Sequence, residues 1–339
     1  MTRACTGPDQ TSNTLGRVTP ASADPSRDQP SRTVIRHEGH RAPAVIVAVV
    51  SAVGVWVMWR FFVTTQRGQT LDQAAFDGSR YGRTTLWQVA EPVLDLISLP
   101  FIAIVLVSAM LLAVLQRRVL LAVQVAVLMG GANLTTQLLK HVVLDRPDLG
   151  VGDSLDNALP SGHTTAAASV SAALLFVVPR RLRPVAAVVG VLYTCATGIS
   201  TLVGRWHRPS DAVAAMLVVL AWAGLASAIG THGRAVRGPE RPRGTVLVVV
   251  GLLLAGVLAG LGTALSLRES LAGVDGGLTS YREMTIAYAS GSLGVVAVVC
   301  VAFAVLLVLR QAAEPRVVEV GPRPSAGRPA SGPAAGTSR

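Results

Sequence analysis

The sequence predicts an all-α fold, a polytopic bundle of about eight membrane-spanning helices, and three observations support that prediction. About half of the residues (51%) are hydrophobic and only 14% are charged, which is too apolar for an ordinary soluble protein. The apolar residues gather in eight segments, most of them near the ~20 residues that a spanning helix needs. Arginine-rich turns alternate with turns that also contain acidic residues, as in multi-pass membrane proteins.

The two ends of the chain depart from this apolar pattern. Residues 1–41 are rich in Ser, Thr, Pro, Asp and Arg without apolar periodicity, so they are expected to form a disordered tail. No short apolar region follows Met1, which argues against a signal peptide. Residues 311–339, dominated by Pro, Ala, Gly and Ser, are expected to form a second disordered tail.

The apolar segments lie between these tails. They are expected at approximately 42–63, 93–115, 119–139, 162–178, 185–203, 211–230, 245–266 and 284–309. The first six are expected to form one domain, 42–230, and the last two, within 231–310, an addition to it. Gly256 and Gly260 in the seventh segment predict a small-residue face for helix packing.

Arginine placement predicts the orientation of the helices. Arginines lie before the first segment and in the turns after the second, fourth and sixth: Arg36, Arg41, Arg117, Arg118, Arg180, Arg181, Arg183, Arg234, Arg237, Arg241 and Arg243. Such turns stay in the cytoplasm. The sequence therefore predicts a cell-membrane protein with both termini in the cytoplasm. The turns expected on the extracytoplasmic side are 64–92, 140–161, 204–210 and 267–283, and the first of them is long enough for a short helix.

Composition also excludes several classes of function. The net charge of +11 does not indicate nucleic-acid binding, because the arginines are scattered among membrane flanks. The three cysteines form no disulfide or zinc pattern, so no metal site and no cofactor are expected. The acids of the turn 140–161 are interpreted as solvated loop residues, because their spacing fits no calcium loop: Asp145, Asp148, Asp153 and Asp156. Nothing in the sequence indicates an oligomeric state.

Polar side chains interrupt the apolar pattern at three places between residues 140 and 211. In the first, Lys140 ends the third apolar segment and Arg146 follows six residues later. Lys140 is the only lysine among 30 basic residues. A compact ammonium group and a planar guanidinium group at this distance can bind one anion together.

The second cluster opens the fourth apolar segment with Pro160, Ser161, Gly162 and His163. The free amides and the positive dipole end of a helix N-terminus bind phosphate readily. Gly162 lets the backbone approach a ligand closely. The Ser161 hydroxyl, taken by itself, is predicted to be a helix cap.

The third cluster runs from Ser200 to Asp211. His207 and Asp211 are four residues apart at the start of the sixth apolar segment. They therefore share one face of the helix, where the carboxylate can hold one imidazole nitrogen. A histidine with a carboxylate one turn deeper in an apolar helix indicates a functional site.

Together the three clusters resemble the type 2 phosphatidic acid phosphatase (PAP2) superfamily, membrane lipid phosphatases related to vanadium haloperoxidases. The resemblance rests on three motifs in the family's order: Lys140 with Arg146 and Pro147; Pro160, Ser161, Gly162 and His163; and Ser200, His207 and Asp211. It covers roughly the first six apolar segments. It implies a PAP2-like six-helix catalytic core within 42–230.

The resemblance also implies an activity, the metal-independent hydrolysis of phosphate esters and anhydrides on lipids. His207 would be the nucleophile that takes the phosphoryl group, Asp211 would orient it, and His163 would protonate the leaving oxygen. The residues expected to hold the phosphate oxygens are Lys140, Arg146, Ser161 and Gly162. The expected partners are a lipid phosphate or lipid diphosphate and the surrounding membrane lipids, and phosphatidate, phosphatidylglycerophosphate and a polyprenyl diphosphate all fit.

The sequence departs from the family pattern at two points. The first motif is one residue shorter than usual between its lysine and its Arg-Pro pair, and Thr201 stands where an arginine is expected. We predict that Arg205, in the turn before His207, replaces the arginine missing at Thr201. Arg208 is the alternative, although it can instead anchor to lipid headgroups.

Two other classes of function stay open at this point. Ser161, His207 and Asp211 can be combined into an intramembrane serine hydrolase, a combination that leaves Lys140 and Arg146 without a role. Alternatively the chain is a catalytically inactive lipid-binding or transport relative, with Thr201 as the sign of lost chemistry.

Overall fold

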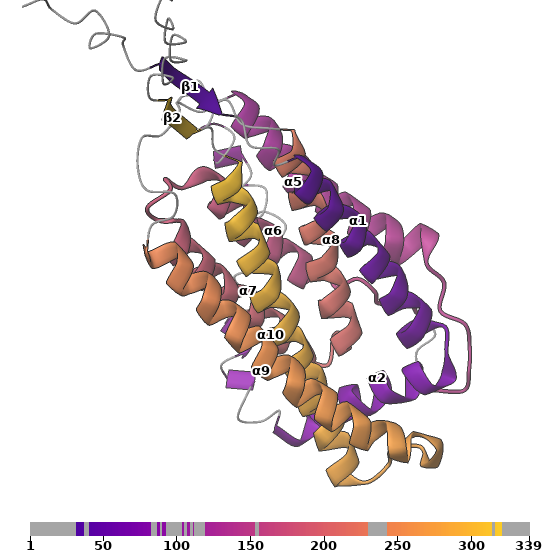
Figure 1. Cartoon of the computed structure of the whole chain (residues 1–339). Helices are drawn as coiled ribbons and strands as arrows, with labels where there is room; N and C mark the ends of the chain where they lie inside the picture. The colour runs from indigo at the N-terminus through magenta and orange to yellow at the C-terminus, as the bar shows by residue number, and fades with distance from the viewer. Residues whose placement is uncertain are drawn as a thin grey trace, which may run out of the picture. The chain divides into compact units, whose positions relative to one another are not determined.

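The computed structural model describes residues 32–36, 41–82, 119–152, 156–229, 243–313 and 316–320, together with a few positions between 87 and 111. Residues 35–317 form one compact unit. The helices in chain order are α1 (Arg41–Met58) with a π-helical turn (Trp59–Val63), α2 (Gln66–Gly78) with a 3-10 turn (Ser79–Gly82), α5 (Val119–Leu138) with a π-helical turn (Leu139–Val143), α6 (Gly162–Val177), α7 (Arg183–Val203), α8 (Pro209–Ala228), α9 (Arg243–Gly273) with a 3-10 turn (Val274–Gly276), and α10 (Tyr281–Ala312) (Figure 1).

The predicted all-α fold is confirmed, with one small addition. Two five-residue strands, β1 (Arg32–Arg36) and β2 (Arg316–Val320), pair with each other. They lie in the two segments for which the sequence predicts disordered tails. Most of the remaining residues of both segments lie outside the described part of the chain.

Six of the described helices are long and apolar enough to cross a membrane: Arg41–Val63, Val119–Val143, Arg183–Val203, Pro209–Ala228, Gly244–Gly276 and Tyr281–Ala312. The chain is therefore a multi-pass membrane protein. The fourth predicted segment is α6, whose 16 residues at ~1.5 Å each fall short of the ~30 Å hydrocarbon core. The second predicted segment, 93–115, lies outside the described residues except for isolated positions.

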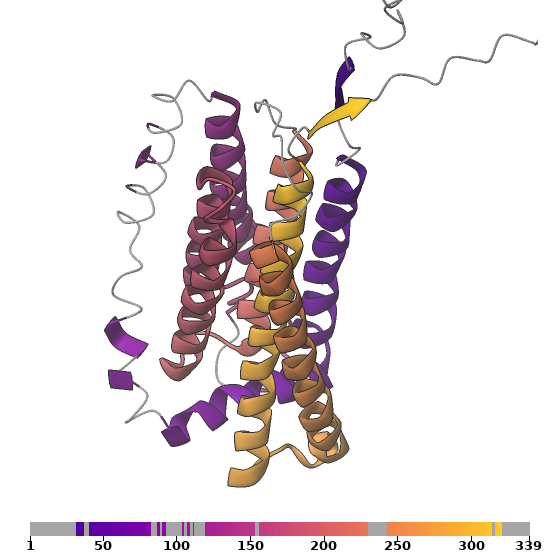
Figure 2. The same cartoon turned by 60° about the vertical axis from the view of Figure 1, so that its left-hand side comes forward.

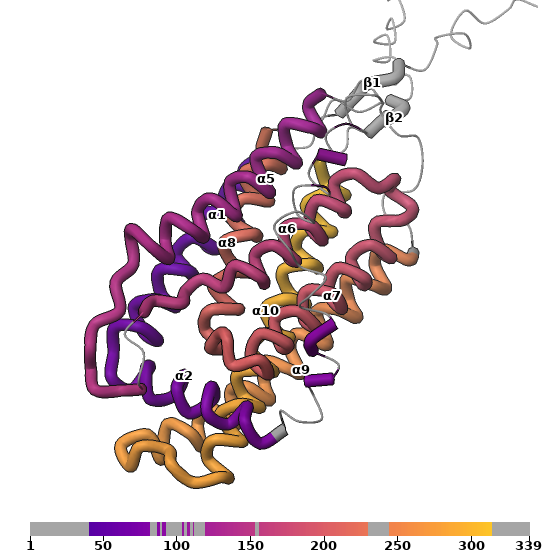
Figure 3. Tube along the Cα trace, turned by 180° about the vertical axis from the view of Figure 1, so that it is seen from behind, coloured from indigo at the N-terminus to yellow at the C-terminus, as the bar shows by residue number. Residues whose placement is uncertain are grey.

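Helix α8 is the centre of the bundle. It packs against α1, α5, α6 and α10, and Figure 3 shows it running between α1 and α10. Small residues dominate its buried surface, among them Ala212, Ala214, Ala215 and Ala223. Small side chains let neighbouring backbones approach closely, which favours helix association inside a membrane. The N-terminal end of α8, which follows His207, is held by this packing.

The last two predicted segments are α9 and α10, which run side by side (Figure 2). A Cβ atom added at Gly256 would come within 2.8 Å of a Val301 methyl group, and the same atom at Gly260 would face Ala297. The predicted small-residue face is therefore a contact between α9 and α10. Helix α10 also reaches the first turn of α8, where a Cβ atom at Gly291 would collide with the Pro209 ring.

Helix α2 crosses the end of the bundle instead of running along it (Figures 1 and 2). It confirms the short helix expected within the turn 64–92, and Thr65 caps it by accepting a hydrogen bond from the Gly68 amide at 3.1 Å. Its buried apolar residues Leu71, Ala74 and Ala75 pack against Ala287 of α10 and its neighbours. Helix α2 is thereby fixed over the end of the bundle where α8 begins.

Candidate functional site

The second and third sequence clusters meet where α6 and α8 begin. The Ser161 amide donates a hydrogen bond to the Asp211 carbonyl at 3.0 Å, which ties the start of α6 to the first turn of α8. Ser161 and Asp211 are fifty positions apart in the chain, and this backbone contact joins their two clusters in one site. Both residues are buried.

His207 and Asp211 make the contact that their spacing predicts. The His207 Nδ1 atom lies 3.1 Å from Asp211 Oδ2, and both side chains are at most 6% exposed. Asp211 Oδ2 also accepts a hydrogen bond from the Arg208 amide at 2.9 Å, within the first turn of α8. An ionised carboxylate only accepts hydrogen bonds, so it holds the proton on Nδ1 and leaves Nε2 with its lone pair.

His163 lies opposite this pair. It is the second residue of α6, its ring centroid is 6.4 Å from that of His207, and it packs against Trp206 at 5.2 Å. Two imidazoles at this separation leave room for one tetrahedral group between them. The arrangement is the one that a nucleophilic imidazole and a proton-donating imidazole acting on the same small group would need.

Ser161 is a helix cap, as its sequence position predicts. Its hydroxyl oxygen accepts hydrogen bonds from the Thr164 amide at 3.3 Å and from the Thr164 hydroxyl at 3.0 Å. The Ser161 hydroxyl proton stays free to be donated to an anion. The nearest neighbour that a Cβ atom at Gly162 would meet is Gln137 Nε2 at 3.9 Å, so packing inside the protein does not require a glycine there.

The turn between α5 and α6 carries the first cluster. Asn157 organises it by donating to the carbonyls of Leu144 at 2.9 Å and Leu159 at 3.0 Å. Gln69 of α2 donates to the Pro147 carbonyl at 3.0 Å. The backbone next to Arg146 is therefore held from both sides, by its own turn and by α2.

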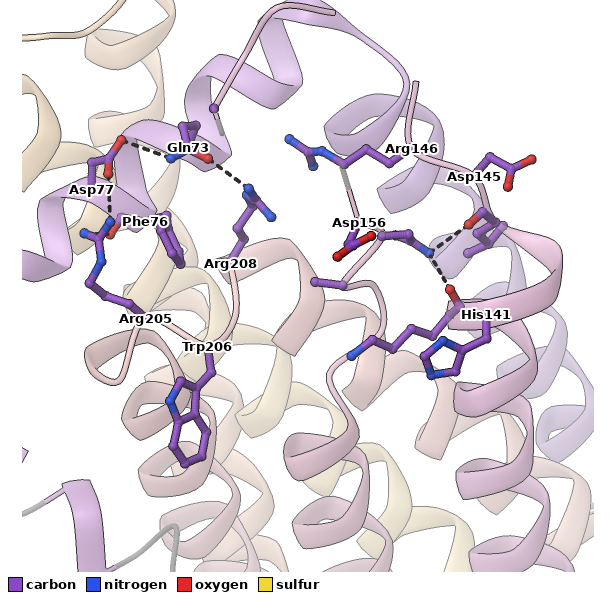
Figure 4. Close-up of a pocket in the computed structure, with 15 residues that line it drawn as sticks. Gln73, Phe76, Asp77, His141, Asp145, Arg146, Asp156, Arg205, Trp206 and Arg208 are labelled. Atoms are coloured by element: carbon purple, nitrogen blue, oxygen red, sulfur yellow. Dashed lines mark hydrogen bonds and ion pairs between the residues drawn. The ribbon is translucent and has the colours of Figure 1, made fainter. Parts of the chain in front are cut away.

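A polar cavity of about 1020 Å³ lies between α2, the turn after α5 and the turn before α8 (Figure 4). Its cationic lining residues are Lys140, Arg146, Arg205 and Arg208, its acidic ones are Asp77, Asp145 and Asp156, and the remainder includes Gln73, Phe76 and Trp206. Neither His163 nor His207 lines this cavity. It adjoins them through Trp206, which precedes His207 in the chain and packs against His163. Lys140, Arg146 and Arg205, predicted as phosphate ligands, thus share one cavity.

The two arginines beside His207 have different surroundings. Arg205, with φ at 59°, pairs with Asp77 at 3.1 Å, donates to the Phe76 carbonyl at 3.1 Å and covers the Phe76 ring. Arg208 is only 7% exposed, and its Nη2 atom donates to Gln73 Oε1 at 2.9 Å. Its Nε atom is buried without a hydrogen-bond partner among the described residues. The Arg205 charge is neutralised by an acid, whereas Arg208 has a neutral amide as its partner.

Arg146, like Arg208, has a buried guanidinium nitrogen without a hydrogen-bond partner. In Arg146 it is the Nη2 atom, which has no partner among the described residues. Partial burial, followed by the nearby charge of Arg208, lowers the pKa of the Arg146 guanidinium below its usual value, although an arginine stays protonated throughout the physiological range. Two guanidinium groups thus face one cavity with N–H donors to spare.

Three residues of α2 belong to the site and were not identified from the sequence. Gln69 and Gln73 bind the first and third clusters, and Asp72 accepts hydrogen bonds from the Ser210 amide at 3.2 Å and from the Ser210 hydroxyl. Burial, followed by the charge of Asp211, raises the pKa of Asp72 to about 7. The four-residue spacing of Gln69 and Gln73 within a predicted short helix is the signal that places these two on one face, and Asp72 lies beside them toward the apolar face.

Comparison with known proteins agrees with the motifs. Residues 121–232, about a third of the chain, match the model of the PAP2 superfamily. The matched residues contain all three clusters and leave α2, α9 and α10 outside. No curated protein and no solved structure matches the chain. Together with the paired histidines and the cationic cavity, the match establishes that residues 121–232 are a PAP2 superfamily domain.

Proposed function

We propose that this membrane protein is a lipid phosphatase that hydrolyses a phosphate monoester or diphosphate on a lipid through a phosphohistidine at His207. The observation that carries the proposal is the His207–Asp211 pair, which faces His163 beside a cavity lined by cations. The PAP2 domain supports phosphate-ester substrates in general. The six candidate spans support a substrate that resides in the membrane.

The first chemical step follows from the tautomer of His207. Its Nε2 lone pair attacks phosphorus, and the bond from phosphorus to the lipid oxygen breaks with its electron pair going to that oxygen. Protonated His163 gives its proton to the leaving oxygen, while Asp211 stabilises the positive charge that develops on the His207 ring. Water then attacks the phosphohistidine, His163 takes the water proton, and the P–N bond breaks to release phosphate.

Charge on the non-reacting oxygens of the phosphoryl group is stabilised by groups already in place. Lys140 and Arg146 line the cavity, and the first-turn amides of α6 at Gly162 and His163 have no partner within the helix. Ser161 adds a hydroxyl proton. Fixed donors of this kind supply most of the catalysis in phosphoryl transfer, because the transition state spreads negative charge over three oxygens.

The serine hydrolase alternative is weaker than the phosphatase. The Ser161 oxygen accepts two hydrogen bonds from Thr164, which is the arrangement of a cap and not that of a nucleophile paired with a base. A serine hydrolase mechanism also gives no role to Lys140 and Arg146, the cations that line the cavity.

The test of the proposed function is phosphate release by purified protein from a panel of phosphatidate, phosphatidylglycerophosphate and a polyprenyl diphosphate, with EDTA present. We expect release from at least one lipid, an acid-labile phosphoenzyme, and no labelling by a serine-directed fluorophosphonate. His207→Ala should lose both release and phosphoenzyme, since removing a nucleophile costs ~10⁴-fold or more. A His207→Ala protein that keeps more than about a tenth of the parent rate would overturn the assignment.

We also propose that the site faces the extracytoplasmic side, with both termini in the cytoplasm and with α9 and α10 as additions to the catalytic domain. The arginine pattern of the turns supports this orientation. Cysteines introduced at Asp148 and Arg181, both exposed and at opposite ends of α6, should respond differently to a membrane-impermeant maleimide in intact cells. Labelling at Arg181 and not at Asp148 would invert the orientation.

A further inference from the structure

Thr201 occupies the position at which the PAP2 motif has an arginine, and the structure shows that it does not serve the site directly. Thr201 is fully buried, and its hydroxyl donates to the Gly198 carbonyl of its own helix α7 at 2.7 Å. A side chain bonded back to its helix offers no donor to a ligand. The phosphate-binding set is therefore one cation short at this position.

Arg205 and Arg208 are the arginines beside His207, and their contacts differ in the way that matters for binding an anion. Arg205 is paired with Asp77, so an anion that bound it would have to compete with a carboxylate already in place. Arg208 makes no direct ion pair among the described residues: its partner Gln73 is neutral, its buried Nε atom has no hydrogen-bond partner there, and Asp72 acts on its charge only from a distance. Burying a cation with a spare donor is costly unless an anion satisfies it.

Arg146 and Arg208 both line the cavity (Figure 4), and each has one guanidinium nitrogen, Nη2 of Arg146 and Nε of Arg208, that is buried without a hydrogen-bond partner among the described residues. Two like charges close together in a partly buried site repel each other, and each lowers the cost of binding a shared anion. A phosphate group, with several acceptor oxygens and up to two negative charges, fits both requirements. The pair is therefore preorganised for an anion and poorly satisfied without one.

Gln73 fixes the direction of the Arg208 side chain. The Gln73 Nε2 atom donates to Asp77 Oδ2 at 3.1 Å, which leaves its Oε1 atom to accept from Arg208 Nη2 at 2.9 Å. The Phe76 ring lies 5.4 Å below the Arg208 guanidinium carbon. An amide oxygen orients a guanidinium group without neutralising its charge. Helix α2, which lies outside the matched PAP2 residues, thus positions a side chain of the catalytic domain.

We propose that Arg208 supplies the phosphate-binding cation missing at Thr201, and that Gln73 of α2 is the residue that positions it. This inference rests on the proposed lipid phosphatase function and adds one phosphate ligand and one positioning residue to it. The geometry favours Arg208 over Arg205, the residue that the sequence predicts for this role.

The test compares Arg208→Ala with Arg205→Ala, because both arginines lie over Phe76 and both contact α2. Binding of inorganic phosphate to the purified protein, measured by calorimetry, is the readout that does not need turnover. We expect Arg208→Ala to weaken phosphate binding at least tenfold and to lower kcat on the best lipid phosphate by on the order of 10² to 10³, the usual loss for one transition-state donor. Arg205→Ala should lose clearly less than Arg208→Ala in both. Arg67→Ala is the control: this exposed arginine of α2 pairs with Asp275 and does not line the cavity, so the variant should stay within about threefold of the parent in both.

Gln73 is tested by two variants and by the conservative change at Arg208. Gln73→Glu can still accept from Arg208 but neutralises its charge and loses the hydrogen bond to Asp77, so we expect phosphate binding weakened roughly tenfold. Gln73→Ala should have little further effect in the Arg208→Ala background, because the two residues act as one unit. Arg208→Lys should restore phosphate binding in part, which separates loss of charge from loss of folding.

Each outcome bears on only one of the two proposals. If Arg208→Ala and Arg208→Lys bind phosphate as the parent does while His207→Ala is inactive, the inference about Arg208 fails and the phosphatase function stands. If the parent releases no phosphate from any lipid in the panel, the phosphatase function fails, and loss of phosphate binding in Arg208→Ala still supports the anion site. A loss in Arg205→Ala as large as that in Arg208→Ala would overturn the choice between the two arginines.

Discussion

Helix α2 separates two cavities of opposite character. One face, with Gln73, Phe76 and Asp77, lines the polar cavity of about 1020 Å³ beside the histidines. Another face, with Leu71, Asp72 and Ala75, lines an apolar cavity of about 220 Å³ that is closed by the end of α1 and by α8, α9 and α10. A single helix of 13 residues therefore separates the candidate reaction site from the apolar interior of the bundle.

Buried charged side chains have different surroundings on the two sides of α2. On the polar side, Arg146 and Arg208 form no direct ion pair within the described part of the chain, although the charge of Asp72 acts on both from nearby, and this arrangement suits a site that receives an anion. On the apolar side, Asp72 accepts hydrogen bonds from Ser210, and its raised pKa lets a proton neutralise it. Changes on the polar side should therefore alter binding and turnover, and changes on the apolar side should alter stability.

After the loss of His207 itself, the largest expected effect comes from Asp211, a residue that lines neither cavity. Asp211→Asn should lower kcat by on the order of 10³, because an amide can stabilise the wrong tautomer of His207 and cannot balance the charge on its ring. Binding of inorganic phosphate should change less than about threefold, since Asp211 does not line the polar cavity. Calorimetry with phosphate and a turnover assay on the same preparation give both numbers. Equal losses in binding and turnover would place Asp211 among the phosphate ligands instead.

A smaller effect is expected on the apolar side. Leu71 is 4% exposed and packs with Val274, Leu278 and Ala287, which hold α2 against α10 and the end of α9. Leu71→Ala should destabilise the protein by ~2–5 kcal/mol, the usual cost of truncating a buried leucine. Turnover at a temperature where the variant is folded should stay within about tenfold of the parent. Leu247→Ala, at an exposed position on α9, is the matched control and should leave the unfolding temperature nearly unchanged.

One result for Leu71→Ala would contradict the separate roles proposed for the two sides of α2. If the variant keeps the parent unfolding temperature but loses the binding of inorganic phosphate, packing on the apolar side controls the polar cavity directly. The inference about Gln73 would then apply to the whole helix and not to one side chain.

The parts of the site that sequence reasoning found are those set by local periodicity. His207 and Asp211 are one helical turn apart, and Ser161 precedes the first turn of a helix, so the contact and the cap follow from spacing alone. The spans followed from apolar length, apart from α6, which lies where predicted but is too short for a candidate span, and segment 93–115, which lies outside the described residues except for isolated positions.

The contribution of α2 could not be predicted in the same way. Gln73 and Asp72 lie 135 and 138 residues from their partners Arg208 and Ser210, and no local pattern shows which polar residues of an outer turn become buried. The ion pair between Arg205 and Asp77 could not be predicted either, because it depends on how α2 packs near the start of α8. Tertiary packing decides which arginine keeps a free charge.

The smallest expected effect concerns the proton on Asp72. The folded protein raises the pKa of this carboxyl from 3.8 to about 7, so between these values the folded state binds more protons than the unfolded state. Stability that depends on this proton is fully present below pH 3.8 and is lost as the pH rises through about 7. The loss is at most ~1.4 kcal/mol per pH unit.

Asp72→Asn removes this dependence, because asparagine mimics the protonated acid and can still accept from the Ser210 amide. Unfolding temperatures of the parent and of Asp72→Asn, measured at several pH values from 5.5 to 8.5, should diverge in favour of the variant until about pH 7.5, and the difference should then level off. Asp148→Asn, a change at an exposed carboxyl in the turn before α6, is the control and should track the parent at every pH. A difference between Asp72→Asn and the parent that is constant with pH would mean that Asp72 has the same charge in the folded and unfolded chain. The acid on the apolar side of α2 would then be neutralised by Arg208 and not by a proton, and Arg208 would have less charge to offer a phosphate.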